Sequence, residues 1–152
     1  MADEIMKGSD DDRPDAAEPP VEVARRTEST PDARVYSLHL LNHDSEALLF
    51  LFDFLSNAGF RVSGSSNVRD GLDYIERERP DLVVANLEMP DLGGLDLLGR
   101  LRELSPSTRV IMTSARVDWI VYEDLLRCGG AFVAAPVKGM SLLRAVERVL
   151  GG

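Results

Sequence analysis

The stretch Leu82–Gly94, which reads LVVANLEMPDLGG, decides the fold of this 152-residue chain. Its first four residues are apolar, and such an uninterrupted run is typical of a strand buried in a parallel sheet. Turn-forming residues follow at once, with Met89-Pro90 and then Gly93-Gly94 marking a loop. Asn86 is therefore the last residue of a buried strand. It should lie at the carboxyl edge of the sheet, where doubly wound proteins gather their functional residues.

The alternation of strand and helix continues on both sides of this stretch. We predict strands at 35–41, 60–64, 82–86, 109–114 and 131–135, and helices at 44–58, 67–79, 95–104, 118–128 and 141–150. The last three helices should bury, respectively, Leu95, Leu98 and Leu101; Val121, Leu125 and Leu126; and Leu142, Ala145, Val146 and Val149. Five strands alternating with five helices predict an α/β fold, a flavodoxin-like doubly wound parallel sheet with strand order 2-1-3-4-5.

Composition narrows the class of protein. The net charge of −9 argues against nucleic acids and anionic membranes as partners, because both attract basic surfaces. Cys128 is the single cysteine, which excludes an internal disulfide framework. The apolar run Ala47–Leu55 contains Asp53 and is too short to span a bilayer, and no apolar leader is visible. We therefore expect a soluble, cytoplasmic protein.

Residues 1–34 differ from the rest of the chain. They contain ten acidic and five basic residues and four of the eight prolines, whereas large apolar side chains are rare. Such a segment cannot bury enough apolar surface to offset its chain entropy, so we predict a disordered acidic tail. The tail is interpreted mainly as solubilising, with a docking role as the alternative, and residues 35–150 should form one domain.

The loop Met89-Pro90 to Gly94, the strand pattern and Pro136 together resemble bacterial response-regulator receiver domains. In that family an aspartate accepts a phosphoryl group from a histidine kinase. Two adjacent acids hold Mg²⁺, and a hydroxyl and a lysine complete the site. Matched residue by residue, the acid pair corresponds to Asn42 and His43, the acceptor to Asn86, the hydroxyl to Ser114 and the lysine to Ala135. Of these groups, the resemblance retains only the hydroxyl.

An amide is a very poor nucleophile and a weaker ligand for a hard cation than a carboxylate. We therefore predict a degenerate pseudo-receiver that is not an enzyme, with a nearly neutral structural pocket and weak or absent Mg²⁺ binding. Of the carboxylates nearby, Asp44 is interpreted as a helix cap rather than a metal contact, and Glu88 as facing solvent. His43 could bind a soft metal or sense pH, although a structural role is favoured for it and for His39.

Aromatic side chains suggest where a partner docks. The fourth predicted helix begins with Trp119 and Ile120, and we expect these residues, with Tyr122, to be partly exposed. The resemblance implies docking or self-association through a surface made of helix four, strand five and helix five. Phe132 matches the position of the family's rotating aromatic residue, and we expect it to hold one rotamer. The alternative is that these aromatics pack beneath the adjoining loop.

These observations predict a stand-alone pseudo-receiver of a two-component or phosphorelay system that acts through phosphorylation-independent protein contacts. Because nothing follows Gly152, we expect no output domain in this chain, unless the chain is a fragment of a larger regulator. One alternative is phosphorylation at a non-standard carboxylate, Asp44 or Glu88. Another is a domain that senses a small ligand in the neutral pocket. The sequence identifies neither the partner nor the oligomeric state.

Overall fold

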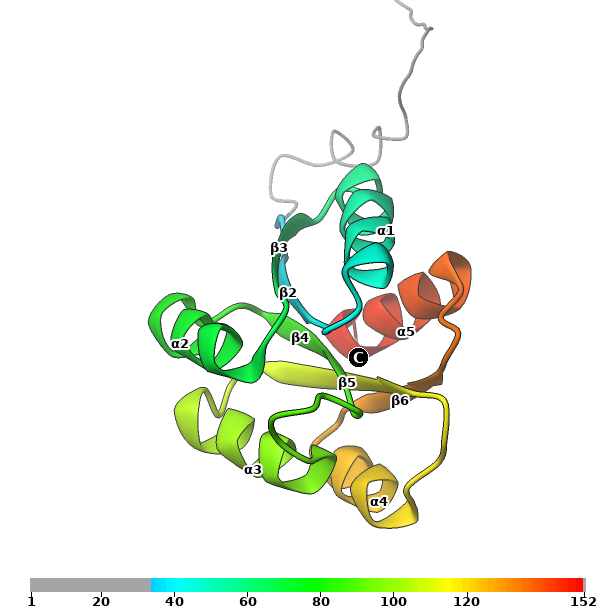
Figure 1. The fold of residues 1–152 in the computed structure, drawn as a ribbon. Coiled ribbons are helices and arrows are strands. Elements are labelled where there is room, and N and C mark those ends of the chain that lie inside the picture. The colour runs from blue at the N-terminus through cyan, green and yellow to red at the C-terminus, as the bar shows by residue number, and fades with distance from the viewer. Residues whose placement is uncertain (1–33, 152) are drawn as a thin grey trace, which may run out of the picture.

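The computed structural model describes residues 34–151 (Figure 1). The strands are β2 (Ser37–Leu41), β3 (Arg61–Ser65), β4 (Leu82–Asn86), β5 (Arg109–Ser114) and β6 (Ala131–Ala134). The helices are α1 (Ser45–Asn57), α2 (Val68–Glu78), α3 (Gly94–Leu104), α4 (Trp119–Arg127) and α5 (Gly139–Gly151). The predicted acidic tail, apart from Arg34, lies outside the described residues.

The five strands form one parallel sheet in the order β3-β2-β4-β5-β6. This order confirms the predicted fold class and its 2-1-3-4-5 topology. The register pairs Leu41 of β2 with Ala85 of β4, and Asn86 of β4 with Thr113 of β5. The carboxyl ends of the three central strands are therefore level, and the residues that follow them share one edge of the sheet.

Helices cover both faces of the sheet, as right-handed crossovers between parallel strands require. Figure 1 shows α1 and α5 on one face and α2, α3 and α4 on the other. Alternate strand residues supply the two cores. Leu38, Leu40 and Val84 pack toward α1 and α5, while Val83 and Met112 pack toward the other three helices.

Two predicted inward positions are wrong. Leu95 is 47% exposed, and Leu97 packs in its place beside Leu98 and Leu101. At 100° per residue, Leu95 lies about 110° around the helix from the centre of that buried stripe. Leu126 is 53% exposed because it lies about 120° from the stripe that Val121 and Leu125 form. The four inward positions predicted for α5 are all buried.

None of the helices within residues 34–151 is both long and apolar enough to cross a membrane.

Candidate functional site

The candidate site lies at the carboxyl edge of the sheet, where the loops after β2, β4, β5 and β6 meet. Asn42 follows β2, Asn86 ends β4, Ser114 ends β5 and Ala135 follows β6. The parallel register brings the first three of these predicted residues to neighbouring strand ends. His43 differs, because it is exposed and makes no hydrogen bond or ion pair with another residue of 34–151.

Asn42 and Asn86 form a closed amide pair. The Asn86 side-chain amide donates to Asn42 Oδ1 at 3.3 Å, and the same oxygen accepts the backbone N–H of Asp44 at 2.9 Å. Asn86 Oδ1 accepts the backbone N–H of Glu88 at 2.8 Å. Asn42 is only 7% exposed, and its Oδ1 accepts both of these hydrogen bonds within the protein.

Two carboxylates of these loops accept backbone N–H groups at the starts of helices. Asp44 Oδ1 accepts the backbone N–H groups of Glu46 and Ala47 at the start of α1, at 3.0 and 3.3 Å. The structure therefore has Asp44 in the capping role predicted for it. Asp91, from the loop after β4, accepts the backbone N–H of Val68 at 3.1 Å and so contacts the start of α2.

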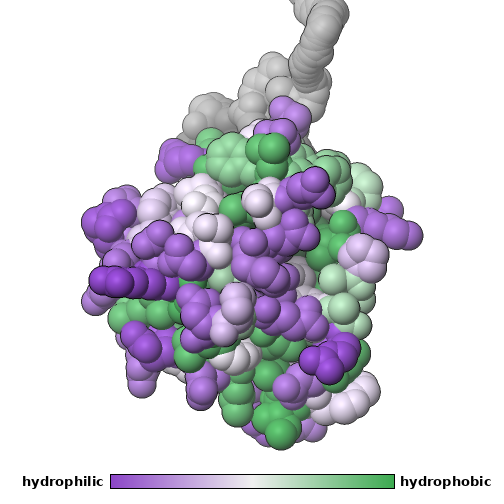
Figure 2. Space-filling view, in the orientation of Figure 1, coloured by the Kyte–Doolittle hydropathy of each residue, from purple (hydrophilic) through white to green (hydrophobic). Residues whose placement is uncertain are grey.

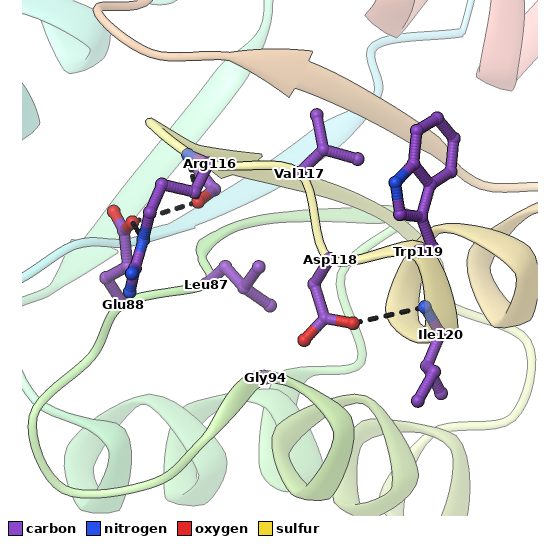
Figure 3. Close-up of a pocket in the computed structure, with 9 residues that line it drawn as sticks. Leu87, Glu88, Gly94, Arg116, Val117, Asp118, Trp119 and Ile120 are labelled. Atoms are coloured by element: carbon purple, nitrogen blue, oxygen red, sulfur yellow. Dashed lines mark hydrogen bonds and ion pairs between the residues drawn. The ribbon is translucent and has the colours of Figure 1, made fainter.

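The Glu88 side chain is exposed, as predicted, but it also makes a contact within the protein. Its Oε2 accepts the hydroxyl of Ser114 at 3.0 Å, although 37% of the side chain remains exposed. The Ser114 oxygen in turn accepts the backbone N–H of Arg116 at 3.0 Å, and Arg116 Nε lies 3.9 Å from Glu88 Oε2 (Figure 3). The pocket is therefore not as neutral as predicted, because the carboxylate of Glu88 accepts a hydrogen bond from the hydroxyl of Ser114.

The buried hydroxyl of Ser114 is the feature from which its contact with Glu88 could have been predicted. Ser114 is 1% exposed at the end of a central strand, and a buried hydroxyl needs an acceptor for its proton. Glu88 is the only acidic residue within two positions of Asn86 along the chain. The sequence alone does not show which way its side chain turns, since the loop backbone sets that direction.

An open hollow of about 590 Å³ lies beside Glu88, between the loop after β4 and the start of α4. Its lining comprises Leu87, Glu88, Gly94, Ser114, Arg116, Val117, Asp118, Trp119 and Ile120 (Figure 3). Leu87 fills the space where a side chain on Gly94 would lie, since a Cβ there would approach Leu87 Cδ1 to 1.7 Å. Glycine at this position therefore lets the hollow's floor pack closely.

The predicted interface residues form an aromatic row that runs from the core to the surface. Trp119 is 69% exposed and meets Tyr122 edge to face at 5.7 Å, and Tyr122 meets Phe132 in the same way at 6.1 Å. Phe132 packs against the core under α2, α3 and α4. Ile120 is 67% exposed. Figure 2 shows apolar side chains gathered at the bottom of the view, where α3 and α4 lie in Figure 1.

His39 lies away from this edge, inside the sheet. Its ring nitrogens contact the hydroxyls of Ser63 at 2.7 Å and Ser65 at 2.9 Å, and the ring stacks on Tyr74 at 4.3 Å. Burial lowers the pKa of His39 from 6.5 to about 4, so the ring is neutral at pH 7. Within residues 34–151, no group of three or more His, Cys, Asp or Glu side chains could hold a metal ion.

Comparisons with known proteins agree with this architecture. The family model described as "Response regulator receiver domain" matches residues 40–147. An uncharacterized 14.6 kDa protein from Leptolyngbya boryana is 30% identical over 113 residues, covering 72% of this chain and 86% of the relative. Chemotaxis protein CheY from Thermotoga maritima is 23% identical over 103 residues, covering 66% and 86%.

The fold also matches solved structures. A CheY-like response regulator receiver domain protein from Methanospirillum hungatei superposes with a TM-score of 0.71 at 24% identity, covering 78% of this chain and 95% of that one.

Proposed function

The chain belongs to the response regulator receiver domain family of two-component signalling, and we propose that it is a pseudo-receiver whose output does not depend on aspartyl phosphorylation. The observation that carries this proposal is Asn86 at the end of β4, the position that the family resemblance gives to the acceptor aspartate. An amide nitrogen or oxygen there cannot form the acyl phosphate that a carboxylate forms.

The surroundings of Asn86 support the same proposal. Its two amide atoms are engaged by Asn42 Oδ1 and by the backbone N–H of Glu88, so the side chain is held rather than presented to a substrate. Ala135 offers no cation at the position of the lysine. A phosphoryl group entering here would not meet a free hydroxyl, because Ser114 donates to Glu88.

We further propose that the protein signals through contacts made by the surface of α4, β6 and α5. Trp119 and Ile120 are large, apolar and mostly exposed, and aromatic residues at such positions are common anchors of protein interfaces. Tyr122 and Phe132 support Trp119 from below, which limits the entropy that the indole loses on binding.

The phosphorylation claim is tested directly on the full chain. Incubation with acetyl phosphate and Mg²⁺ should leave the intact mass unchanged, and beryllofluoride should leave the Trp119 fluorescence unchanged. A receiver domain that retains the acceptor aspartate and the acid pair serves as the positive control. A mass gain of one phosphoryl group on this chain would contradict the proposal.

The alternative of phosphorylation at another carboxylate is distinguished by the same experiment. Glu88 is the better placed of the two candidates, because it contacts a hydroxyl and lies near Arg116. If a mass gain occurs and the variant Glu88→Gln loses it, Glu88 is the acceptor. If Asp44→Asn loses it instead, the helix cap is the acceptor.

A further inference from the structure

We infer that Glu88 is a positioning residue, whose carboxylate holds residues 115–118 and thereby fixes the start of α4. The inference deepens the proposed function, because its consequence for a partner rests on docking through Trp119 and Ile120. The holding contact itself is a property of the domain alone and can be tested without a partner.

The contact is a continuous chain of hydrogen bonds. Ser114 is buried at the end of β5, and its hydroxyl carries one proton and accepts through its lone pairs. The proton goes to Glu88 Oε2 at 3.0 Å, and the oxygen accepts the backbone N–H of Arg116 at 3.0 Å. Because the carboxylate takes the proton, the Ser114 oxygen is oriented to receive the loop amide.

The loop has little else to hold it. Residues 115–118 are all exposed, and among the described residues the hydrogen bond from Arg116 is the only one that a backbone N–H of 115–117 donates. Asp118 then caps α4 by accepting the backbone N–H groups of Ile120 and Val121. The first turn of α4 is packed against the core through Val121, which is 2% exposed, and the Arg116 contact and this cap are the hydrogen bonds that lead the chain into it.

Glu88 also joins two loops that are far apart in the sequence. It belongs to the loop after β4, and Figure 3 shows it on one side of the hollow, opposite Trp119 and Ile120. Arg116 Nε at 3.9 Å adds an ion pair that is largely exposed to solvent and therefore weak. The hydrogen bond to Ser114 is thus the stronger of the two side-chain contacts that Glu88 makes across the loops, beside the backbone bond from Leu87 to Thr113.

Hydrogen–deuterium exchange of the full chain tests the inference. In Ser114→Ala, the amide of Arg116 loses its acceptor and should exchange about tenfold faster, since one net hydrogen bond no longer restrains it. In Glu88→Ala the exchange should also be faster, because the Ser114 hydroxyl is no longer oriented by the carboxylate and can turn away from this amide. Glu88→Gln should remain close to the wild type, because its amide oxygen can still accept the Ser114 proton. Acrylamide should also quench Trp119 fluorescence differently in Glu88→Ala and the wild type.

Asp91→Ala is the matched control. Asp91 lies in the same loop as Glu88, but its carboxylate contacts Val68 at the start of α2. This variant should alter exchange near Val68 and leave residues 115–121 unchanged. Unchanged exchange of residues 115–121 in Glu88→Ala would overturn the inference. So would a Glu88→Gln variant as fast as Glu88→Ala, since charge rather than the hydrogen bond would then be responsible.

The exchange experiment tests the role of Glu88, and the phosphorylation experiment tests the proposed function, so either proposal can be contradicted without the other. No phosphodonor or partner is present in the exchange experiment, so its failure would leave the proposed function standing. A phosphoryl group found on the full chain would contradict the proposed function without changing the measured exchange of the unmodified protein.

Discussion

Two parts of the molecule pair a titratable side chain with a serine hydroxyl, and they differ in burial. His39 lies between Ser63 and Ser65 and is 1% exposed, whereas Glu88 contacts Ser114 with 37% of its side chain exposed. The inner pair is sealed by Tyr74, while the outer pair borders an open hollow. Because His39 is buried, its protonation is coupled to the unfolding of the domain. Because Glu88 is partly exposed, changing it should affect the loop 115–118 without unfolding the domain.

The largest expected effect concerns the inner pair. The folded protein holds the pKa of His39 at about 4, and the unfolded chain restores it to 6.5. Between these values the unfolded state binds more protons, so stability falls as the pH drops from 6.5 to 4. The total loss should be about 3 kcal/mol, and none of it should be felt above pH 6.5.

Urea unfolding at pH 7.0 and pH 4.5 measures this effect. The variant His39→Gln keeps hydrogen-bonding groups between the serines but does not titrate, and the carboxylates shared by both proteins affect both alike. The pH-dependent loss should therefore be smaller in the variant by about 2–3 kcal/mol. Equal losses in the two proteins would show that the histidine is not kept neutral by the fold.

The second effect concerns the amide pair, which is intermediate in exposure. Asn86→Asp would replace the donor to Asn42 Oδ1 with an oxygen, so two acceptors would face each other. We expect the free energy of unfolding to fall by about 1–3 kcal/mol at pH 7, because a partly buried carboxylate gains no cation there.

The same variant should remain unphosphorylated by acetyl phosphate, which intact mass measures alongside the melt. Asn86→Ala is the comparison for loss of the amide without a new charge. If Asn86→Asp were as stable as the wild type and took up phosphate, the site would still be organised for the chemistry of the family.

The smallest effect on the fold should come from the outer surface. Trp119→Ala should cost about 1 kcal/mol of stability or less, since the indole is 69% exposed. It should weaken a complex formed through α4 by about 2 kcal/mol or more, as loss of an aromatic anchor does. Leu49→Ala, an exposed apolar residue on α1, is the control for a general loss of surface hydrophobicity.

Thermal melts and analytical ultracentrifugation of the full chain compare the two variants. Self-association that Trp119→Ala weakens and Leu49→Ala does not would support the α4 surface. A stability loss of about 3–5 kcal/mol in Trp119→Ala would instead mean that the indole is part of the core.

The fold could be predicted from the sequence because strand runs, caps and glycines agree with one another. Asp44 caps α1, Asn67 caps α2 and Asp118 caps α4 through the side-chain bonds that such residues are expected to make. The errors at Leu95 and Leu126 arose because these two helices contain more leucines than their buried faces can hold. The sequence pattern therefore did not determine which leucines face the core.

The location of the site at the sheet edge could be predicted from the sequence, but the contacts between its side chains could not. Parallel register brings Asn42, Asn86 and Ser114 to one edge whatever their side chains do. The turn of Glu88 toward Ser114 depends on loop torsions, which no residue pattern reveals. The exposure of His43 has the same origin, since it lies in the loop before the capping residue Asp44.

The Glu88–Ser114 hydrogen bond has a consequence in time. A phosphoryl group on a receiver has a lifetime, and its hydrolysis sets how long a signal lasts. The carboxylate of Glu88 is a permanent part of the chain and is not removed by hydrolysis. A loop that Glu88 holds therefore does not change its state with time after a stimulus, as a phosphorylated receiver does. If the output is independent of phosphorylation, as proposed, its strength is set by the concentration of the protein relative to the dissociation constant of its complex with the partner.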